Sequence, residues 1–333
     1  KIITLAASIE EKTVDILNDT FTDSGSINVD GARIKCWRHG GHGTQTYLQV
    51  VQNSCNPGFV SLGQKLGKER LFSYIENFGF GKKTGIDLNG EENGILFSLS
   101  RVGPVELATS SFGQGISVTA IQQITAVSAA INGGNLYKPY VVKRIVEPNT
   151  KEIIKENKPT IVRKVISNET SQTVRMALET VVAYGTGRNA YIEGYRVGGK
   201  TGTAQKVKNG VYLPSNYIVS FIGFLPADNP QAVVYVAVDN PKGITQYGGT
   251  VSAPIAKSIM KDIISKLNIE KSDYTLEKKY QWFDEKYYAI PNIVGLSKKE
   301  AIKLLKNFNI EYTGSGEYVK SVSPSEGTIL KEY

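Results

Sequence analysis

The chain has 333 residues, and because one domain usually takes roughly 100–200 residues, two domains are expected. Hydrophobic residues make up 41% and charged residues 21%, as in ordinary folded proteins, which excludes disordered, collagen-like and coiled-coil chains. The net charge of +8 suits an anionic surface or polymer but is too small to indicate nucleic-acid binding.

Helical spacing of apolar residues opens the chain and recurs along it. Residues 1–9 are expected to form a buried helix, because a broad apolar face is formed by Ile2, Ile3, Leu5, Ala6 and Ile9. Residues 19–43 are rich in Gly, Asp, Asn and Ser without periodicity, which indicates a loop or short hairpin. Further helices are expected over residues 47–51, from Pro57 onward, over 121–131 and between Ser167 and Gly185.

Strand-like patterns then replace the helical ones. Three β-rich runs cover residues 195–205, 217–225 and 232–238, with turn residues Asn209-Gly210 and Asp228-Asn229-Pro230 between them. A last amphipathic helix is expected over residues 255–267. This order predicts an α+β fold in which an antiparallel sheet is covered by helices on both faces.

The C-terminal part differs in composition from the rest. Residues 269–286 are charged and aromatic and are expected to be a linker between a domain of residues 1–268 and a module of residues 287–333. In this module Ser297 and Glu300 form a capping box before a short helix. Strand-like pieces follow at residues 310–312 and 318–322, so a small α+β module is predicted.

Two short motifs indicate chemistry. The string Gly198-Gly199-Lys200-Thr201-Gly202-Thr203 lies in a strand pattern, and glycine in a strand often marks close approach by a ligand or another backbone. We expect Gly202 to admit a substrate peptide, Lys200 to supply positive charge, and the Thr201 and Thr203 hydroxyls to bind a carboxylate. The second motif is Ser54-Cys55-Asn56, at a junction between two predicted helices.

In this order the two motifs resemble the Ser-x-Asn and Lys-Thr-Gly elements of serine penicillin-binding proteins and β-lactamases. The opening Lys-Ile-Ile-Thr-Leu-Ala-Ala is similar to the segment that begins with the lysine of their Ser-x-x-Lys element. The resemblance implies that Lys1 is this lysine and that the acylated serine lies three positions before it. It therefore implies a fragment of a longer protein, in which an N-terminal anchor holds the domain at the extracytoplasmic face of the membrane.

The resemblance implies a division of labour among these residues. Lys1 is the base that activates the serine, Ser54 relays the proton, and Asn56 holds Lys1 and the substrate amide. The backbone N–H of Thr203 belongs to the oxyanion hole. A lysine acts as a base only when neutral, so we expect burial and the nearby charge of Lys200 to lower the pKa of Lys1.

The fate of the acyl-enzyme separates the subfamilies. Class A β-lactamases hydrolyse it with a Glu-x-x-x-Asn element, and no Glu between Glu69 and Glu193 has Asn four residues later. A D,D-transpeptidase that acts on peptidoglycan stem peptides and is blocked by β-lactams is therefore expected. A D,D-carboxypeptidase and a β-lactam sensor or wall-binding protein that never turns over remain alternatives.

The tail narrows the resemblance. Pro291-Asn292-Ile293-Val294-Gly295-Leu296 and Pro324-Ser325-Glu326-Gly327 resemble a PASTA module, so the chain is similar to a class B penicillin-binding protein with a PASTA tail, most like the sporulation-specific form. This implies spore-cortex synthesis in the forespore envelope and a glycan-polymerising membrane partner.

A metal site is a separate hypothesis. Both histidines of the chain lie in Cys36-x-x-His39-x-x-His42, and Cys and His are preferred ligands of Zn²⁺. We expect Cys36, His39, His42 and Asp30 as ligands, with Cys55 or Asp23 as alternatives to Asp30. The ion would be structural, because acyl transfer itself requires no cofactor. The alternative is three unrelated residues, with Cys36 as a small buried hydrophobe.

Overall fold

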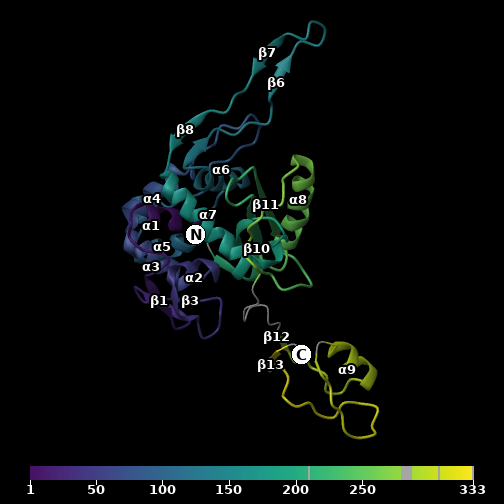
Figure 1. Ribbon diagram of the computed structural model, residues 1–333. Helices are drawn as coiled ribbons and strands as arrows, with labels where there is room; N and C mark the ends of the chain where they lie inside the picture. Colours follow the sequence, from purple (N-terminus) through teal and green to yellow (C-terminus); the bar gives the residue numbers. More distant parts are fainter. Residues whose placement is uncertain (209–210, 279–286, 307, 332–333) are drawn as a thin grey trace. The chain divides into compact units, whose positions relative to one another are not determined.

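The computed structural model describes residues 1–208, 211–278, 287–306 and 308–331. The chain divides into two compact units, Lys1–Lys279 and Tyr280–Tyr333 (Figure 1). The predicted turn Asn209-Gly210 and residues 279–286 of the predicted linker lie outside the described residues. The exact domain boundaries proposed from the sequence therefore stay predictions.

The first unit contains a lobe of packed helices and one further helix on the other side of a sheet. Those of the lobe are α1 (Ile2–Glu10), α2 (Tyr47–Gln52), α3 (Asn56–Leu66), α4 (Lys68–Asn77), α5 (Pro104–Phe112), α6 (Ala120–Ile131) and α7 (Asn168–Tyr184), and the separate helix is α8 (Ser252–Leu267). Helix α1 is buried from Ile2 to Ser8 and packs on α3, α4, α6 and α7. No helix in the described part of the chain is both long and apolar enough to cross a membrane.

The central sheet is antiparallel and has the strand order β11–β10–β9. Its strands are β9 (Gly198–Lys208), β10 (Val211–Leu225) and β11 (Ala232–Asp239). Within the described residues β9 pairs only with β10, so its other edge remains open. An open edge offers unpaired backbone groups to an extended peptide.

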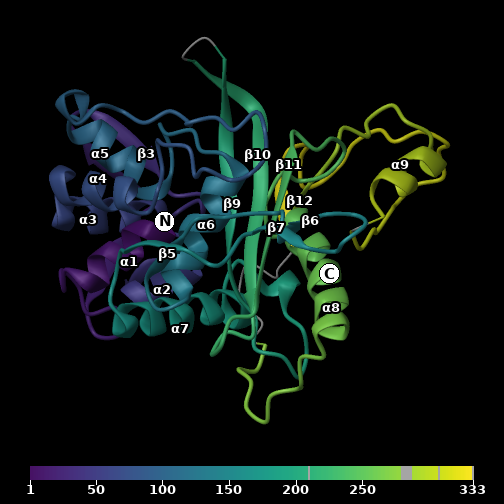
Figure 2. The same cartoon turned by 90° about the horizontal axis from the view of Figure 1, so that it is seen from above.

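Alternate side chains of β10 enter two different cores. Ile222 and Phe224 join the core of the helical lobe, whereas Phe221 and Leu225 join a second core with α8. Neighbouring side chains of a strand point to opposite faces, so this split places helices on both faces of the sheet. Figure 2 shows the long strands between the helical lobe and α8. The predicted α+β architecture is confirmed.

The glycine-rich segment after α1 contains short strands rather than an unstructured loop. The strands β1 (Thr20–Asp23) and β4 (Gly43–Thr46) pair with each other, as do β2 (Ser26–Val29) and β3 (Ala32–Lys35). The sequence allowed a loop or one short hairpin, and the structure contains two antiparallel pairs. Asp30 lies at the tight β2–β3 turn with φ 47° and is exposed.

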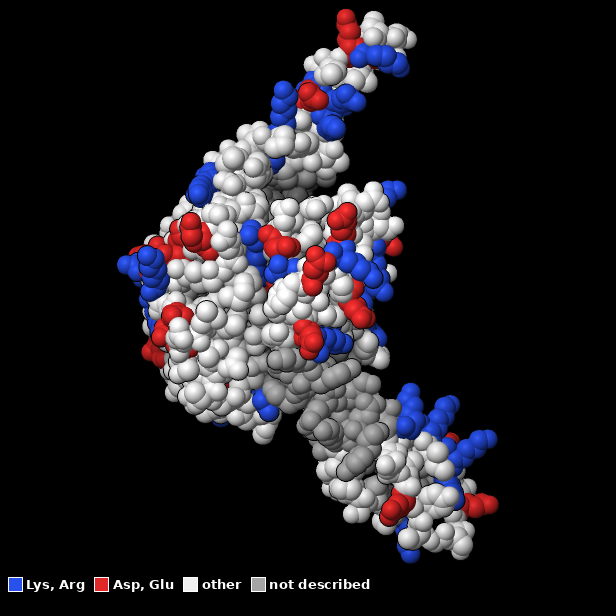
Figure 3. All heavy atoms as spheres, in the orientation of Figure 1, with Lys and Arg blue, Asp and Glu red and all other residues white. Residues whose placement is uncertain are grey.

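An extended arm of two successive antiparallel strand pairs between α6 and α7 was missed by the sequence analysis. It consists of β5 (Asn135–Tyr137), β6 (Arg144–Val146), β7 (Ile153–Glu156) and β8 (Ile161–Lys164), in which β5 pairs with β8 and β6 with β7. Every residue of β6, β7 and β8 is exposed, so no alternation of buried and exposed residues marks these strands. Figure 3 shows several Lys and Arg side chains along this arm.

The second unit contains helix α9 (Lys298–Leu304) and the paired strands β12 (Tyr287–Ala289) and β13 (Ile329–Lys331). The predicted capping box is present, since the Glu300 N–H donates to Ser297 and the Ser297 N–H to Glu300. The predicted strands at 310–312 and 318–322 were wrong. Tyr312 and Tyr318 are 64% and 68% exposed, and only an isolated bridge joins Tyr318 to Ser297.

Candidate active site

The junction of α2 and α3 fixes the position of Ser54. Helix α2 ends at Gln52, and Cys55 already caps α3 by accepting a hydrogen bond from the Gly58 N–H, 3.4 Å away. Ser54, the one residue between the two caps Asn53 and Cys55, has φ 54°, a left-handed conformation that residues with a Cβ seldom adopt. Such strain concentrates at functional sites.

Lys1 lies at the N-cap of α1 and reaches this junction. Its Nζ donates to the Ser54 carbonyl oxygen at 2.9 Å, to Ser54 Oγ at 3.0 Å and to Asn56 Oδ1 at 2.7 Å. The Nζ also lies 5.3 Å from the centre of the Phe59 ring. The structure thus brings together three residues that the sequence predicted for the site.

Lys200 reaches the same hydroxyl from β9. Its Nζ donates to Ser54 Oγ at 2.7 Å and to the Thr201 carbonyl oxygen at 3.2 Å, and Lys200 is 5% exposed. The Ser54 hydroxyl therefore lies between two amines that are 199 positions apart in the sequence. One hydroxyl oxygen cannot hold two ammonium groups at little cost, so proton occupancy of the two lysines is linked.

Burial governs the charge of both amines. Loss of water around Lys1 lowers its pKa from 10.5 to about 8, while the nearby Cys55 and Cys36 act in the opposite direction. The pKa of Lys200 falls well below its ordinary value, first through burial and then through the charge of Lys1. The lowering of the Lys1 pKa by burial agrees with the expectation from the sequence. The expected effect of the Lys200 charge on Lys1 does not, because the charge of Lys1 instead lowers the pKa of Lys200.

The rest of the β9 motif is tied to neighbouring segments. Thr201 Oγ1 and Thr186 Oγ1 are 2.8 Å apart, and the Gly248 N–H donates to Thr203 Oγ1 at 3.4 Å. A Cβ on Gly202 would clash with the Ser220 hydroxyl on β10. Packing within the sheet thus gives a reason for glycine at this position that the sequence did not reveal, and the expected role of Gly202 in admitting a substrate stays a prediction.

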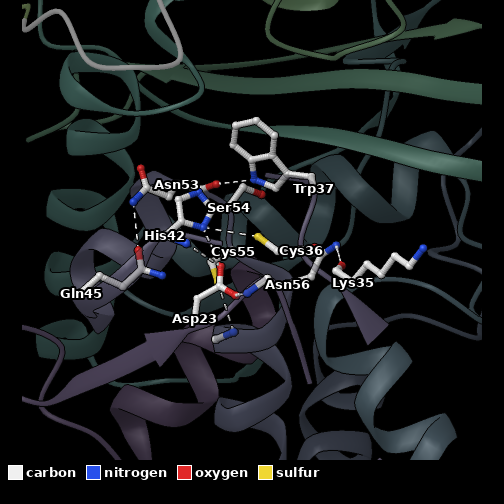
Figure 4. Close-up of polar contacts among 12 residues, drawn as sticks. Asp23, Lys35, Cys36, Trp37, His42, Gln45, Asn53, Ser54, Cys55 and Asn56 are labelled. Atoms are coloured by element: carbon white, nitrogen blue, oxygen red, sulfur yellow. Dashed lines mark hydrogen bonds and ion pairs between the residues drawn. The ribbon is translucent and has the colours of Figure 1, made fainter. Parts of the chain in front are cut away.

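A second polar cluster adjoins the junction. Asp23, Cys36, His42 and Cys55 each offer a ligand atom, and these atoms all lie within 4.8 Å of one another (Figure 4). Asp23 Oδ2 lies 2.8 Å from His42 Nδ1 and accepts a bond from Cys55 Sγ at 3.3 Å, and Cys36 Sγ lies 3.3 Å from His42 Nδ1. We refer to these four residues as the Cys–His–Asp cluster.

Hydrogen bonding sets the charges in this cluster. Burial acts to raise the pKa of Asp23, but bonds from Cys36, His42, Gly25 and Cys55 outweigh it and leave the pKa below its usual value. The bond between the two thiols lowers the pKa of Cys36 to about 6 and raises that of Cys55. The cluster therefore places negative charge near Lys1, where Cys55 and Cys36 act to raise the pKa of the amine.

Two of the four expected metal ligands are not in this cluster. His39 is exposed on its loop, and Asp30 is exposed at the β2–β3 turn. The cluster has Asp23 and Cys55 in their places, the two residues that we considered as alternatives. The paired strands β1 and β4 bring the end of β1, with Asp23, beside the start of β4, next to His42, a contact that sequence spacing does not reveal.

Comparison with known proteins identifies the family. Residues 1–261 match the penicillin-binding protein transpeptidase domain, and residues 288–333 match the PASTA domain. The chain belongs to the penicillin-binding protein transpeptidase family. This confirms the resemblance inferred from its motifs. Acyl transfer in this family requires no cofactor.

Curated relatives are similar to this chain over all or most of its length. Stage V sporulation protein D of Bacillus subtilis is 60% identical over 332 residues, covering 100% of this chain and 51% of that protein. Penicillin-binding protein PbpB of Mycobacterium tuberculosis is 31% identical over 281 residues, covering 81% of this chain and 41% of that protein. The chain thus spans about half the length of the curated relatives it matches.

Solved structures of penicillin-binding proteins have the same fold. The transpeptidase domain of Burkholderia pseudomallei penicillin-binding protein 3 has a TM-score of 0.73 and 32% identity, covering 82% of this chain and 80% of that one. Penicillin-binding protein 3 of Mycobacterium tuberculosis, solved with ampicillin, has a TM-score of 0.75 and 30% identity, covering 84% and 64%. The latter protein was also solved with aztreonam.

Sequence analysis missed residues that support the site without belonging to its motifs. Thr186 contacts Thr201, Trp37 donates a hydrogen bond to Asn53 next to Ser54, and Tyr247 packs on Trp37. An aromatic pair from two distant loops leaves no periodic pattern. The string Gln246-Tyr247-Gly248-Gly249 between β11 and α8 was the one local hint, because consecutive glycines often mark close backbone approach.

Proposed function

We propose that this protein is a peptidoglycan D,D-transpeptidase. It acylates a serine three positions before Lys1 with the D-Ala-D-Ala end of a stem peptide, releases D-alanine, and transfers the acyl group to an amine of a neighbouring stem. The main support is the hydrogen-bonded row Lys1–Ser54–Lys200, in which one hydroxyl lies 3.0 and 2.7 Å from two buried amines.

In acylation, neutral Lys1 accepts the proton of the serine hydroxyl as the serine oxygen bonds to the penultimate carbonyl carbon. Its pKa near 8 leaves an appreciable neutral fraction at neutral pH, which an ordinary lysine lacks. The C–N bond to the terminal D-alanine then breaks, and the departing amine takes a proton through Ser54 Oγ. The backbone N–H of Thr203, with that of the serine, stabilises the oxyanion.

The substrate carboxylate is held at β9. Thr201 and Thr203 supply hydroxyls, the backbone at Gly202 supplies the strand edge, and Lys200 supplies charge. An anion beside Lys200 favours its protonated form and opposes the lowering of its pKa by burial. Substrate binding thus moves a proton onto Lys200 and leaves Lys1 as the neutral base.

The acceptor distinguishes the alternatives. A D,D-carboxypeptidase uses water in place of the amine, and a sensor stops at the acyl-enzyme. The names of the relatives favour transfer, since several are called peptidoglycan D,D-transpeptidases. The 60% identity to a stage V sporulation protein supports work in the spore cortex, at the extracytoplasmic face of the forespore envelope, through an N-terminal membrane anchor and beside a glycan-polymerising membrane partner.

The test uses the full-length protein, including the residues before Lys1. Fluorescent penicillin labels the active serine, and a stem pentapeptide is supplied with and without an amine acceptor such as glycine. A transpeptidase forms a stable penicillin adduct and yields the amine-transfer product, here a stem peptide with glycine in place of the terminal D-alanine, only when the amine is present. Equal D-alanine release without acceptor indicates a carboxypeptidase, and labelling without any product indicates a sensor. Failure to label contradicts acyl transfer altogether.

We also propose that the Cys–His–Asp cluster binds structural Zn²⁺. Two thiols, an imidazole and a carboxylate are a ligand set that zinc accepts in a tetrahedron, and all four side chains are already gathered. The ion would brace the loop that leads from Cys36 to His42 and, through Cys55, the start of α3. It would take no part in acyl transfer.

Metal analysis of the full-length protein, purified without a histidine tag, tests this proposal. We expect about one equivalent of zinc, lost in Cys36→Ser and retained in His39→Ala, since His39 lies outside the cluster. Less than about half an equivalent in the wild type would retire the zinc site. Such a result leaves the transpeptidase proposal untouched.

A further inference from the structure

Trp37 touches both the Cys–His–Asp cluster and the catalytic junction. Its indole ring meets the His42 ring edge to face, with centroids 5.6 Å apart, and its Nε1–H donates to the Asn53 carbonyl oxygen at 2.8 Å. Figure 4 shows the indole above His42 with its nitrogen directed at Asn53. The ring contact with His42 and the hydrogen bond to Asn53 both hold the indole in place.

The Asn53 carbonyl is a sensitive point of the backbone. It belongs to the peptide group that joins Asn53 to Ser54, so its orientation is coupled to the left-handed conformation of Ser54. The Asn53 side chain is held as well, because its Nδ2 donates to Gln45 Oε1 at 2.9 Å. A donor at this carbonyl therefore stabilises the one backbone conformation that aims Ser54 Oγ between Lys1 and Lys200.

Trp37 also contacts Tyr247, a residue of the segment that meets β9. Trp37 and Tyr247 lie with ring centroids 6.3 Å apart, at an angle of 63°. Tyr247 directly precedes Gly248, whose N–H donates to Thr203 Oγ1 and whose Cα leaves no room for a Cβ beside the Gly202 and Ser220 carbonyls. The Tyr247 segment is thereby pressed against the carboxylate-binding strand.

We propose that Trp37 is a positioning residue for acylation. By holding the Asn53 carbonyl and packing on Tyr247, it fixes the position of the Ser54 hydroxyl relative to β9. The base Lys1, the relay Ser54 and the carboxylate-binding strand are then all in place for acylation. Displacements of about 1 Å in such groups cost about a hundredfold in rate. This inference rests on the proposed acyl transfer but not on the proposed zinc ion.

The test compares three aromatic substitutions in the full-length protein. Trp37→Phe keeps a ring but removes the N–H donor, Tyr247→Ala removes the partner ring, and Trp282→Phe is the matched control at the only other tryptophan. Binding and acylation by fluorescent penicillin are separated by rapid kinetics, and rates are expressed per labelled site. We expect the acylation rate constant to fall about tenfold in Trp37→Phe and about threefold in Tyr247→Ala, with penicillin binding changed less than twofold.

A merely structural role gives a different result. It would lower thermal stability and the labelled fraction while leaving the acylation rate constant per labelled site unchanged, and this outcome overturns the proposal. If Trp37→Phe fails to fold, an unchanged rate constant in Tyr247→Ala overturns it equally. Zinc is measured in every variant, and recovery of the Trp37→Phe rate on adding zinc would assign the loss to the metal and overturn the positioning role. Absence of labelling in the wild type would instead contradict acyl transfer.

Discussion

The proposed catalytic residues and the Cys–His–Asp cluster adjoin each other, yet the fold brings them together in different ways. Lys1, Ser54 and Lys200 come from a helix start, a helix junction and a strand. The cluster takes Asp23 and His42 from strand ends and the loop between them, where no regular spacing applies. In helices and strands the spacing of residues in a motif predicts which side chains lie close together. In an irregular segment the sequence shows which residue types are present but not which of them are in contact.

The two regions also differ in the sign of charge that their side chains can carry. Two amines surround the neutral Ser54 hydroxyl, while the cluster next to it contains a carboxylate and two thiols. Burial lowers the pKa of Lys1, and the neighbouring Cys55 and Cys36 act to raise it. The reactive state of the site is therefore a balance between loss of water and attraction by the cluster. Substitutions of the two lysines should therefore act mainly on the acylation rate, and substitutions in the cluster mainly on the free energy of unfolding.

The largest effect is expected from removing either amine. Lys1→Met and Lys200→Met should each slow penicillin acylation by about a thousandfold or more, because the base or its linked partner is lost. Lys1→Met should also raise the free energy of unfolding by about 1–3 kcal/mol at pH 7, since it removes a buried amine whose pKa is lowered. Acylation kinetics and urea unfolding measure both. Wild-type acylation in Lys1→Met would contradict the assignment of the base.

The cluster should show the opposite balance, with a large effect on stability and a small one on chemistry. Asp23→Asn weakens an acceptor for Gly25, His42 and Cys55, so we expect a loss of about 2–4 kcal/mol in unfolding free energy. Asp30→Asn makes the same chemical change at an exposed turn with positive φ, where Asn is well tolerated, and should be neutral. Equal unfolding curves for the two variants would show that the cluster does not stabilise the fold.

The pH dependence of the acylation rate and of the stability tests the lowered pKa of Lys1, the residue on which burial and the cluster act in opposite directions. With a pKa near 8 for Lys1, the acylation rate should rise about tenfold per pH unit below 8 and level off above it. The folded pKa lies below the unfolded 10.5, so between about pH 8 and 10.5 the unfolded chain binds a proton that the folded chain lacks. In that window this amine's contribution to stability rises with pH. The difference between wild type and Lys1→Met isolates it, and a pH-independent difference would refute the lowered pKa.

Sequence reasoning predicted the side chains that the structure gathers around Ser54 Oγ because each belongs to a short linear motif. Ser54 and Asn56 are separated by one residue, and Lys200 to Thr203 are contiguous. It could not assign the reason for Gly202, because the clash with Ser220 depends on the register between β9 and β10. It expected burial to lower the pKa of Lys1 but assigned the charge effect to Lys1 rather than to Lys200, because the relative burial of the two amines is a property of the assembled core.

Other predictions from the sequence failed where no linear motif or periodic pattern marks the structure. Strands β6, β7 and β8 are exposed at every residue, so no hydrophobic alternation marks them. The segments at 310–312 and 318–322 have strand-like residues, but within the described residues they form no more than the isolated bridge from Tyr318 to Ser297. His39 lies three residues from both Cys36 and His42 in the sequence but is not part of the cluster. Such spacing predicts contacts only on a helix or strand. Asp23, which the pairing of β1 with β4 brings in, took the place that spacing gave to Asp30.

The smallest expected effect comes from Thr186, which joins the two sides of the catalytic site. Its N–H donates to the Gln52 carbonyl oxygen at 3.0 Å, and its hydroxyl meets that of Thr201 at 2.8 Å. Thr186→Val keeps the first bond and removes the second, at a cost of about 1 kcal/mol, or about fivefold. Since Thr201 is assigned to the carboxylate, the loss should fall on penicillin binding rather than on the acylation rate constant, and Thr186→Ser should restore it. An effect on the rate constant alone would place Thr201 with the Ser54 relay instead of with the carboxylate.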